Sequence, residues 1–153
     1  QIKRMDFMIV GRDYIGVGVG AMVFNNQGQV FLAKRGPKAR NERGHWEFPG
    51  GGVDFGERLS DAIKREFYEE YEMHIELIKL LDVSDHILVS EEQHWVSPTF
   101  IARHVGGEPR IVEPEKCTEI GWFALDELPQ PLSLVTQDDV THYREQYGSD
   151  TEE

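Results

Sequence analysis

The sequence predicts an α/β protein in which a mixed β-sheet is sandwiched between helices. Three observations favour this fold class: short apolar segments separated by turn residues, an amphipathic segment in the middle of the chain, and a capped segment near its end. A length of 153 residues suits one domain and is too short for two ordinary ones. We therefore expect a single domain over residues 1–153, ordered from about Phe7 to Tyr147.

The strands are predicted from apolar runs that are bounded by turn residues. The expected strands are Ile15–Phe24, Gln29–Arg35, Trp46–Phe48, Ile75–Val83, Trp95–Val105 and Glu119–Leu125. Asn25–Gly28 supplies the turn of a hairpin between the first two strands. Gly36–Gly44 is expected to be a polar, basic loop, and Gly50–Gly52 a glycine loop after Pro49.

Two helices are expected. The first runs from about Leu59 to Met73, where apolar residues recur with helical spacing. The second ends at Tyr147 before Gly148, and Thr136 with Asp139 resembles a capping box at its start.

Composition narrows the classes of partner. The formal net charge is −12, so the basic surface that holds polymeric DNA or RNA is not expected. A small anion remains suitable, because carboxylates gathered around a divalent cation can bind phosphate. No apolar run approaches the ~20 residues of a membrane span. The single cysteine, Cys117, favours a reducing cytoplasm, and we expect its side chain to be buried.

The central helix carries an anomaly. At about 100° per residue, one face must pack on the sheet, and its apolar members are Leu59, Ala62, Ile63 and Phe67. Glu66 and Glu70 fall within that face, and Glu69 lies at its edge. An unpaired buried carboxylate costs several kcal/mol, and two carboxylates one turn apart repel each other.

A divalent cation resolves this conflict, because hard cations prefer oxygen ligands and Glu66 and Glu70 are close enough to share one. Glycines just before the helix let the backbone approach a ligand closely. The glycine loop and the carboxylate-bearing helix together predict a metal-dependent phosphate site.

The same segment contains a spaced motif of Gly, five residues, Glu, seven residues, then Arg-Glu-X-X-Glu-Glu, whose positions are Gly51, Glu57, Arg65, Glu66, Glu69 and Glu70. With each residue type at about one in twenty, six matches have a chance frequency on the order of 10⁻⁸ per starting position. The segment resembles the Nudix box. The preceding strand pair and Val112–Leu128 resemble MutT-like nucleoside triphosphate diphosphatases of the Nudix family.

The resemblance implies the Nudix α/β/α fold and hydrolysis of X-diphosphate compounds with Mg²⁺, for which Mn²⁺ can substitute. The implied metal ligands are Gly51, Glu66, Glu69, Glu70 and, from outside the motif, Glu115. Glu113 and Glu119 are alternatives to Glu115 as the further ligand or general base. Arg65 is implied to pair with Glu57 and to fix the glycine loop against the helix.

One position departs from the family pattern. Glu72 stands where the family usually has glycine at the end of the helix. Glycine there would serve as a left-handed cap, and a glutamate adds negative charge at the negative end of the helix dipole. We expect a cost in stability and no loss of chemistry.

Basic residues cluster between Lys34 and Arg43 in an otherwise acidic chain. Lys34 and Arg35 are candidates for binding distal phosphates, although a solvated loop of flexible basic side chains fits the pattern nearly as well. Trp46 is a candidate for stacking on a base, whereas Phe48 is expected in the core.

Three functions compete. The favoured one is hydrolysis of a nucleoside or deoxynucleoside triphosphate to the monophosphate and pyrophosphate. ADP-ribose or another nucleoside diphosphate sugar is the alternative substrate, but such members usually carry a proline where this chain has Leu88–Ser90. A non-catalytic Nudix-fold binding module is the third, although such proteins lose motif glutamates that this chain keeps. The sequence is compatible with a homodimer.

Overall fold

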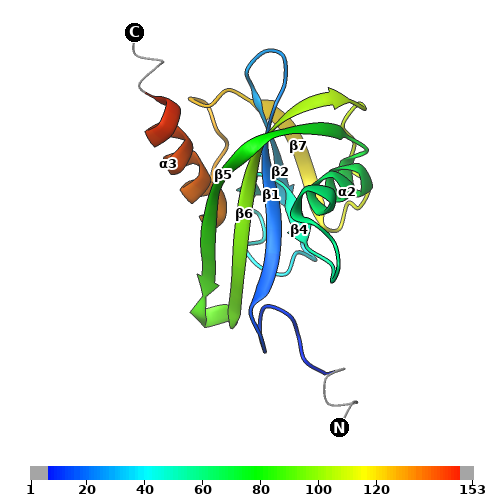
Figure 1. The fold of residues 1–153 in the computed structure, drawn as a ribbon, viewed down its shortest axis with the longest axis vertical. Helices are drawn as coiled ribbons and strands as arrows, with labels where there is room; N and C mark the ends of the chain where they lie inside the picture. The colour runs from blue at the N-terminus through cyan, green and yellow to red at the C-terminus, as the bar shows by residue number, and fades with distance from the viewer. Residues whose placement is uncertain (1–6, 149–153) are drawn as a thin grey trace.

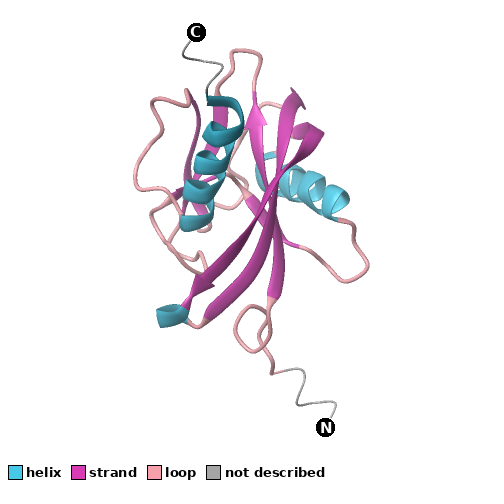
Figure 2. Ribbon diagram, turned by 60° about the vertical axis from the view of Figure 1, so that its left-hand side comes forward, coloured by secondary structure: helices cyan, strands magenta, loops and turns pink. Residues whose placement is uncertain are grey.

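The computed structural model describes residues 7–148. A seven-stranded sheet lies between α2 (Leu59–Tyr71) and α3 (Leu134–Tyr147), which cover opposite faces of the twisted sheet in Figure 2. The expected α/β sandwich with a mixed sheet is confirmed. The prediction of one domain over residues 1–153 also covers both chain ends, which lie outside the described residues. No helix within residues 7–148 is long and apolar enough to cross a membrane.

The strands are β1 (Gly16–Phe24), β2 (Val30–Arg35), β3 (Trp46–Glu47), β4 (Gly50–Gly52), β5 (His74–Leu88), β6 (Gln93–Gly106) and β7 (Cys117–Phe123). Figure 1 labels every strand of the sheet except the short β3. The main path through the sheet is β3-β2-β1-β6-β5, while β4 pairs with β1 and β7 pairs with β2. The β1–β6 pair is parallel and the other pairs are antiparallel, which makes the sheet mixed.

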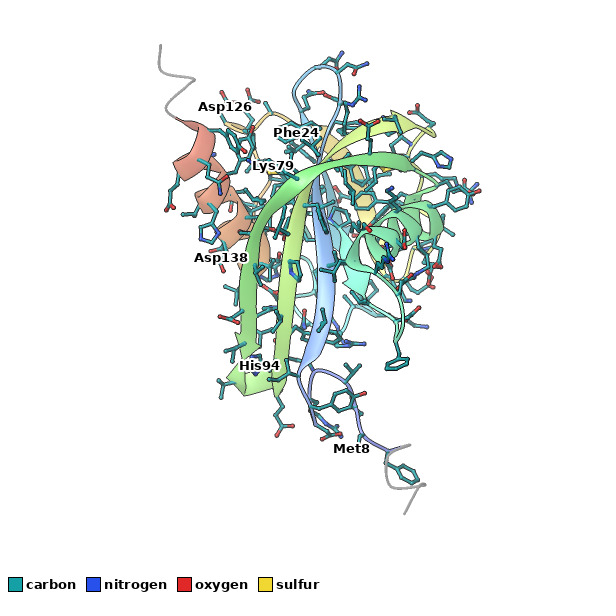
Figure 3. All side chains as sticks on the ribbon, viewed as in Figure 1. Met8, Phe24, Lys79, His94, Asp126 and Asp138 are labelled. Atoms are coloured by element: carbon teal, nitrogen blue, oxygen red, sulfur yellow. The ribbon has the colours of Figure 1, made fainter. Side chains whose placement is uncertain are left out.

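The predicted elements exist, and their bounds differ at the ends. β5 extends to Leu88, five residues beyond the predicted end at Val83. It does so because its last residue, Leu88, pairs with Gln93, the first residue of β6. The short 3₁₀ helix η1 (Val89–Glu91) connects the two strands. His94 marks the end at which β5 and β6 join, and Lys79 lies towards the other end of β5 in Figure 3. The glycines Gly50–Gly52, expected as a loop, form strand β4.

Alternation along β1 divides the core between the two helices. Val19, Ala21 and Val23 point to the side of α2, where they pack in one cluster with Ile63 and Phe67. On the other side the cluster beneath α3 holds Met22, Val30, Leu32, Trp46, Leu132 and Val140. Cys117 is buried in the first cluster, as expected from its size and polarity.

The cap of α3 corrects the prediction. Ser133, and not Thr136, is the N-cap: its hydroxyl accepts a hydrogen bond from the backbone N–H of Thr136. The Thr136 hydroxyl instead accepts from the backbone N–H of Phe48 at 3.0 Å. α3 is thereby attached to the segment that leads into the glycine strand.

Glu72 ends α2 in the left-handed conformation, with φ of 57° and ψ of 33°. The backbone N–H of Met73 donates to Phe67 and that of Glu72 donates to Tyr68, which completes the turn. The Glu72 carboxylate forms an exposed ion pair with Arg110 at 3.2 Å. The family's usual glycine would adopt this backbone without steric cost, so the expected strain is present.

The substitution Glu72→Gly should therefore raise the free energy of unfolding by about 1 kcal/mol, because the strain of a left-handed residue exceeds the entropy that glycine adds to the unfolded chain. Thermal unfolding followed by circular dichroism measures the change. Glu72→Ala is the matched control, since it removes the exposed ion pair and keeps the strain. Equal stability of the two variants would contradict this account.

Candidate functional site

The site begins where two glycine-rich strands touch. β4 pairs with β1 through Gly18↔Gly52 and Gly20↔Gly50. A side chain on Gly50 would place its Cβ 2.0 Å from the carbonyl oxygen of Val19. At Gly51 a Cβ would lie 2.5 Å from the carboxylate oxygens of Glu66. These glycines are required because the backbone and the Glu66 carboxylate occupy the space that side chains would need.

Arg65 joins the loop after β4 to α2. Its guanidinium donates two hydrogen bonds to the Glu57 carboxylate, from Nε at 2.7 Å and from Nη2 at 2.9 Å. Nη1 donates to Glu66 at 3.0 Å and to Glu69 at 2.9 Å. A planar guanidinium suits such a forked contact. The structure thus places Arg65 and Glu57 together, and Glu66 and Glu69 contact the same guanidinium group.

The motif glutamates have opposite electrostatic environments. Hydrogen bonds from Arg65 lower the pKa of Glu57 to about 2. Burial raises the pKa of Glu70 to about 8, and the neighbouring charges of Glu66, Glu47 and Glu113 add to this shift. Burial also raises the pKa of Glu66. The helix face therefore holds carboxylates whose negative charge is incompletely balanced.

That imbalance fits a divalent cation, which would neutralise the carboxylates and prefers their oxygen atoms. Within residues 7–148, no three acidic, histidine or cysteine side chains already converge as a metal ion requires. Glu66 and Glu69 each accept a hydrogen bond from Nη1 of Arg65, so both carboxylates are partly engaged by that guanidinium. Glu70 has no such partner among the described contacts of residues 7–148, and the charge of Glu66 adds to its raised pKa.

A cleft of about 560 Å³ opens beside Glu70. Gly18 and Gly20 of β1 line it, together with Gly51 of β4 and Glu70 of α2. Residues of the segment Gly36–Gly44, here called the roof loop, line the cleft from another side. A volume in this range is ordinary for a small-molecule site.

Several predicted residues lie elsewhere. Trp46 is 7% exposed, packs edge-on against Phe123 and does not line the cleft, because its strand directs it into the core beneath α3. Lys34 also lies outside the cleft and forms an ion pair with Glu119 at 3.8 Å. Glu115 is exposed and outside the cleft, whereas Glu113, its alternative, lines it.

Arg35 lines the cleft, but its donors are used inside the protein. Nη1 donates to Glu47 at 2.9 Å, while Nε and Nη2 donate to the carbonyl and side-chain oxygens of Asn41 at 2.8 and 3.2 Å. Burial raises the pKa of Glu47, and the charge of Arg35 opposes that shift. Arg35 as a phosphate ligand remains a prediction, and these contacts favour a supporting role.

Polar residues on β5 and β6 were missed by the sequence analysis. Trp95, Ser97 and Thr99 alternate along β6, opposite His86, Ser84 and Asp82 of β5. Thr99 donates to Asp139 of α3, and burial together with Asp82 raises the pKa of Asp139 to about 9. The available signal was the alternation of polar with apolar residues along both segments, which places the polar side chains of each strand on one face of the sheet.

Comparisons with known proteins agree with this geometry. The NUDIX domain family model matches residues 15–144. A MutT NUDIX hydrolase from Burkholderia pseudomallei has a similar structure, with a TM-score of 0.78, 42% sequence identity, and coverage of 84% of this chain and 97% of that chain.

Two curated relatives are RNA pyrophosphohydrolases. That of Bartonella bacilliformis is 31% identical over 73% of this chain and 79% of its own length. That of Vibrio atlanticus is 41% identical over 53% of this chain, and the match spans only 44% of its own length. With the motif, the fold and the family model in agreement over residues 15–144, the chain belongs to the Nudix hydrolases.

Proposed function

We propose that this chain hydrolyses a nucleoside or deoxynucleoside triphosphate to the monophosphate and pyrophosphate. The observation that carries the proposal is that one cleft joins acidic and basic groups. Glu70 and Glu113 line it, and so do Lys38, Arg40 and Lys116. A polyphosphate requires positive charge along its whole length. Carboxylates can supply it by holding a metal cation, and basic side chains can supply it directly.

Enzymes of this family act on pyrophosphate bonds and generally use divalent metal ions. We propose Mg²⁺ as the cation, with Mn²⁺ as a substitute, held by Glu66, Glu70 and the Gly51 carbonyl. When bound, the cation lowers the pKa of a water molecule and neutralises charge on phosphate oxygens. Glu69 can join these ligands by leaving Arg65.

The remaining roles belong to the chain itself. Arg65 and Glu57 hold the loop after β4 against α2, so that the Gly51 carbonyl and the Glu66 carboxylate keep their positions. Glu113 replaces Glu115 as our candidate for the further carboxylate, because it lines the cleft and its charge acts on Glu70. We assign the phosphates of the leaving group to Lys38, Arg40 and Lys116, because these three basic side chains line the cleft.

The triphosphate at the 5′ end of an RNA is the second candidate substrate. The relatives named RNA pyrophosphohydrolases favour it. The net charge of −12 argues against an extended RNA surface, but a 5′ end requires only its first nucleotide in the cleft. Comparing kcat/KM for free nucleoside triphosphates with that for a 5′-triphosphorylated oligoribonucleotide distinguishes the two.

The first prediction concerns Glu70. Glu70→Gln should lower kcat about a hundredfold or more with Mg²⁺, because a neutral amide is a poor ligand for a hard cation. Circular dichroism should show an intact fold. Glu76→Gln on β5, an exposed partner of Arg103, is the matched control and should keep wild-type turnover. Wild-type kcat in the Glu70 variant would remove α2 from the catalytic centre.

The second prediction concerns pH and stability without metal. The pKa of Glu70 is about 8 in the folded protein against 4.5 for the ordinary group. The folded state therefore binds more protons than the unfolded state between these values, and stability must fall as pH rises from about 5 to 8. Urea unfolding across this range measures the fall, which should be smaller for Glu70→Gln. A slope unchanged by the substitution would show that Glu70 is not its source.

The third prediction concerns the bond that breaks. Cleavage of a triphosphate should release pyrophosphate and the monophosphate without a covalent enzyme intermediate, because the thiol of Cys117 is buried and its pKa is raised by burial to about 11. Hydrolysis in ¹⁸O-labelled water should place one label in one of the two products. Inorganic phosphate as the first product, or a trapped phosphoryl-enzyme, would refute this mechanism.

A further inference from the structure

The roof loop crosses the cleft and is attached on both sides. On its near side, the backbone N–H groups of Gly36 and Lys38 donate to the carbonyls of Lys116 and Glu115 at 2.8 and 2.9 Å. On its far side, two side chains reach the opposite wall. The Arg40 guanidinium lies 4.7 Å from the centre of the Trp95 ring, and a Glu42 carboxylate oxygen lies 3.0 Å from Nε2 of His86.

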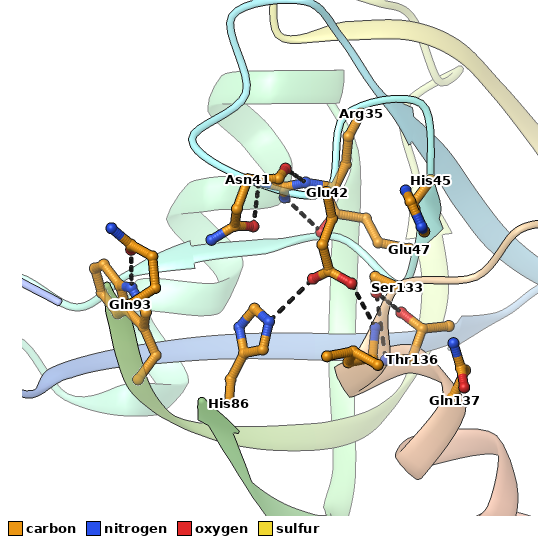
Figure 4. A network of polar contacts seen from close by, with 12 residues as sticks. Arg35, Asn41, Glu42, His45, Glu47, His86, Gln93, Ser133, Thr136 and Gln137 are labelled. Carbon is orange, nitrogen blue, oxygen red and sulfur yellow. Dashed lines mark hydrogen bonds and ion pairs between the residues drawn. The ribbon is translucent and has the colours of Figure 1, made fainter. Parts of the chain in front are cut away.

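The contacts of Arg40 and Glu42 reach the same cross-strand pair, here called the His86–Trp95 rung. His86 of β5 and Trp95 of β6 are directly paired across the two strands. The other Glu42 oxygen accepts a hydrogen bond from the backbone N–H of Leu134, at the first turn of α3, at 2.8 Å. Figure 4 shows Glu42 between the loop, His86 and the start of α3. One carboxylate thus connects the loop to two separate elements.

The Glu42–His86 contact is sheltered from water. The side chains of His86 and Glu42 are only 11% and 10% exposed, so the carboxylate has lost most of its hydration. Its backbone has φ of 45°, a left-handed conformation that a non-glycine residue adopts at a steric cost. Strain and carboxylate burial at the same residue persist only where the surrounding contacts compensate for both.

We propose that Glu42 is a positioning residue: by holding the roof loop on the His86–Trp95 rung, it sets where Lys38 and Arg40 meet the phosphates of the substrate. This inference rests on the proposed function. Glu42 does not touch the Gly51–Glu70 end of the cleft in any described contact between residues 7 and 148. Its loss should therefore weaken substrate binding and leave the chemical step nearly unchanged.

The first arm of the test needs no substrate. Lys38, Arg40 and Arg43 are trypsin sites within the roof loop, so limited proteolysis of the folded protein reports how often the loop opens. Glu42→Gln and His86→Leu should each speed cleavage after Arg40 and Arg43 about tenfold, since each removes the buried contact between the Glu42 carboxylate and His86. Glu42→Gly should do the same although it relieves the backbone strain. Glu91→Gln, an exposed glutamate of η1, should behave as wild type.

The second arm uses steady-state kinetics with a nucleoside triphosphate and Mg²⁺. Glu42→Gln and His86→Leu should each raise KM about tenfold with kcat within about twofold, and the double variant should be no worse than either single one, because all three remove one contact. Thermal unfolding confirms that each variant is folded. The proposal is overturned if the single variants are cleaved by trypsin at the wild-type rate. It is also overturned if cleavage is faster but KM is unchanged, or if the rise in KM in the double variant is the product of the two single effects.

The two arms separate this proposal from the function on which it rests. If the wild-type protein hydrolyses no triphosphate, the proposed function fails, and unchanged proteolysis then overturns the role of Glu42 while faster cleavage supports it. If wild-type turnover is normal and the Glu42 variants match it in both arms, only the role of Glu42 fails.

Discussion

The close contact between β4 and β1 is the constraint on which the site depends. Because Gly50 has no side chain, β4 can approach the Val19 carbonyl of β1. Because Gly51 has none, the Glu66 carboxylate can lie against the backbone there. A Cβ at Gly50 would require the backbone of β1 to move, and a Cβ at Gly51 would displace the Glu66 carboxylate. The Arg65–Glu57 fork then fixes the following loop, and through it the direction in which α2 presents its glutamates. The positions of the glutamates therefore depend first on how closely the backbones of β4 and β1 pack.

The same residue type serves two purposes within one motif. Glu57 is paired with Arg65, its pKa is lowered to about 2, and it acts as a structural anion. Glu70 is buried among other carboxylates and its pKa is raised to about 8, which leaves it in need of a cation. The two identical side chains differ because hydrogen bonds from Arg65 lower the pKa of Glu57, whereas burial and neighbouring carboxylates both raise the pKa of Glu70.

Arginine shows a similar division. Arg35 and Arg65 use their fork geometry on internal partners, Asn41 and Glu47 in one case and the motif glutamates in the other. Arg40 instead reaches across the cleft to an aromatic ring. These three arginines thus organise the walls of the cleft and the loop beside it in a chain whose net charge is acidic.

The sequence by itself determined the fold class, most of the strands, the central helix and the glutamates that share its buried face. These follow from local periodicity and from the spacing of one motif, both of which are properties of neighbouring residues. Even the strain at Glu72 could be expected, because a left-handed helix end depends on local backbone conformation.

Only the tertiary structure decided which distant residues meet. It placed Glu113 on the cleft and Glu115 outside it, put Trp46 in the core, and brought Trp95 and His86 to the cleft. For Trp46, His86 and Trp95, strand register decides the placement, because a shift of one residue turns a side chain to the opposite face of the sheet. That register is set by pairing between segments far apart in the chain, such as β1 with β6, which local patterns do not specify.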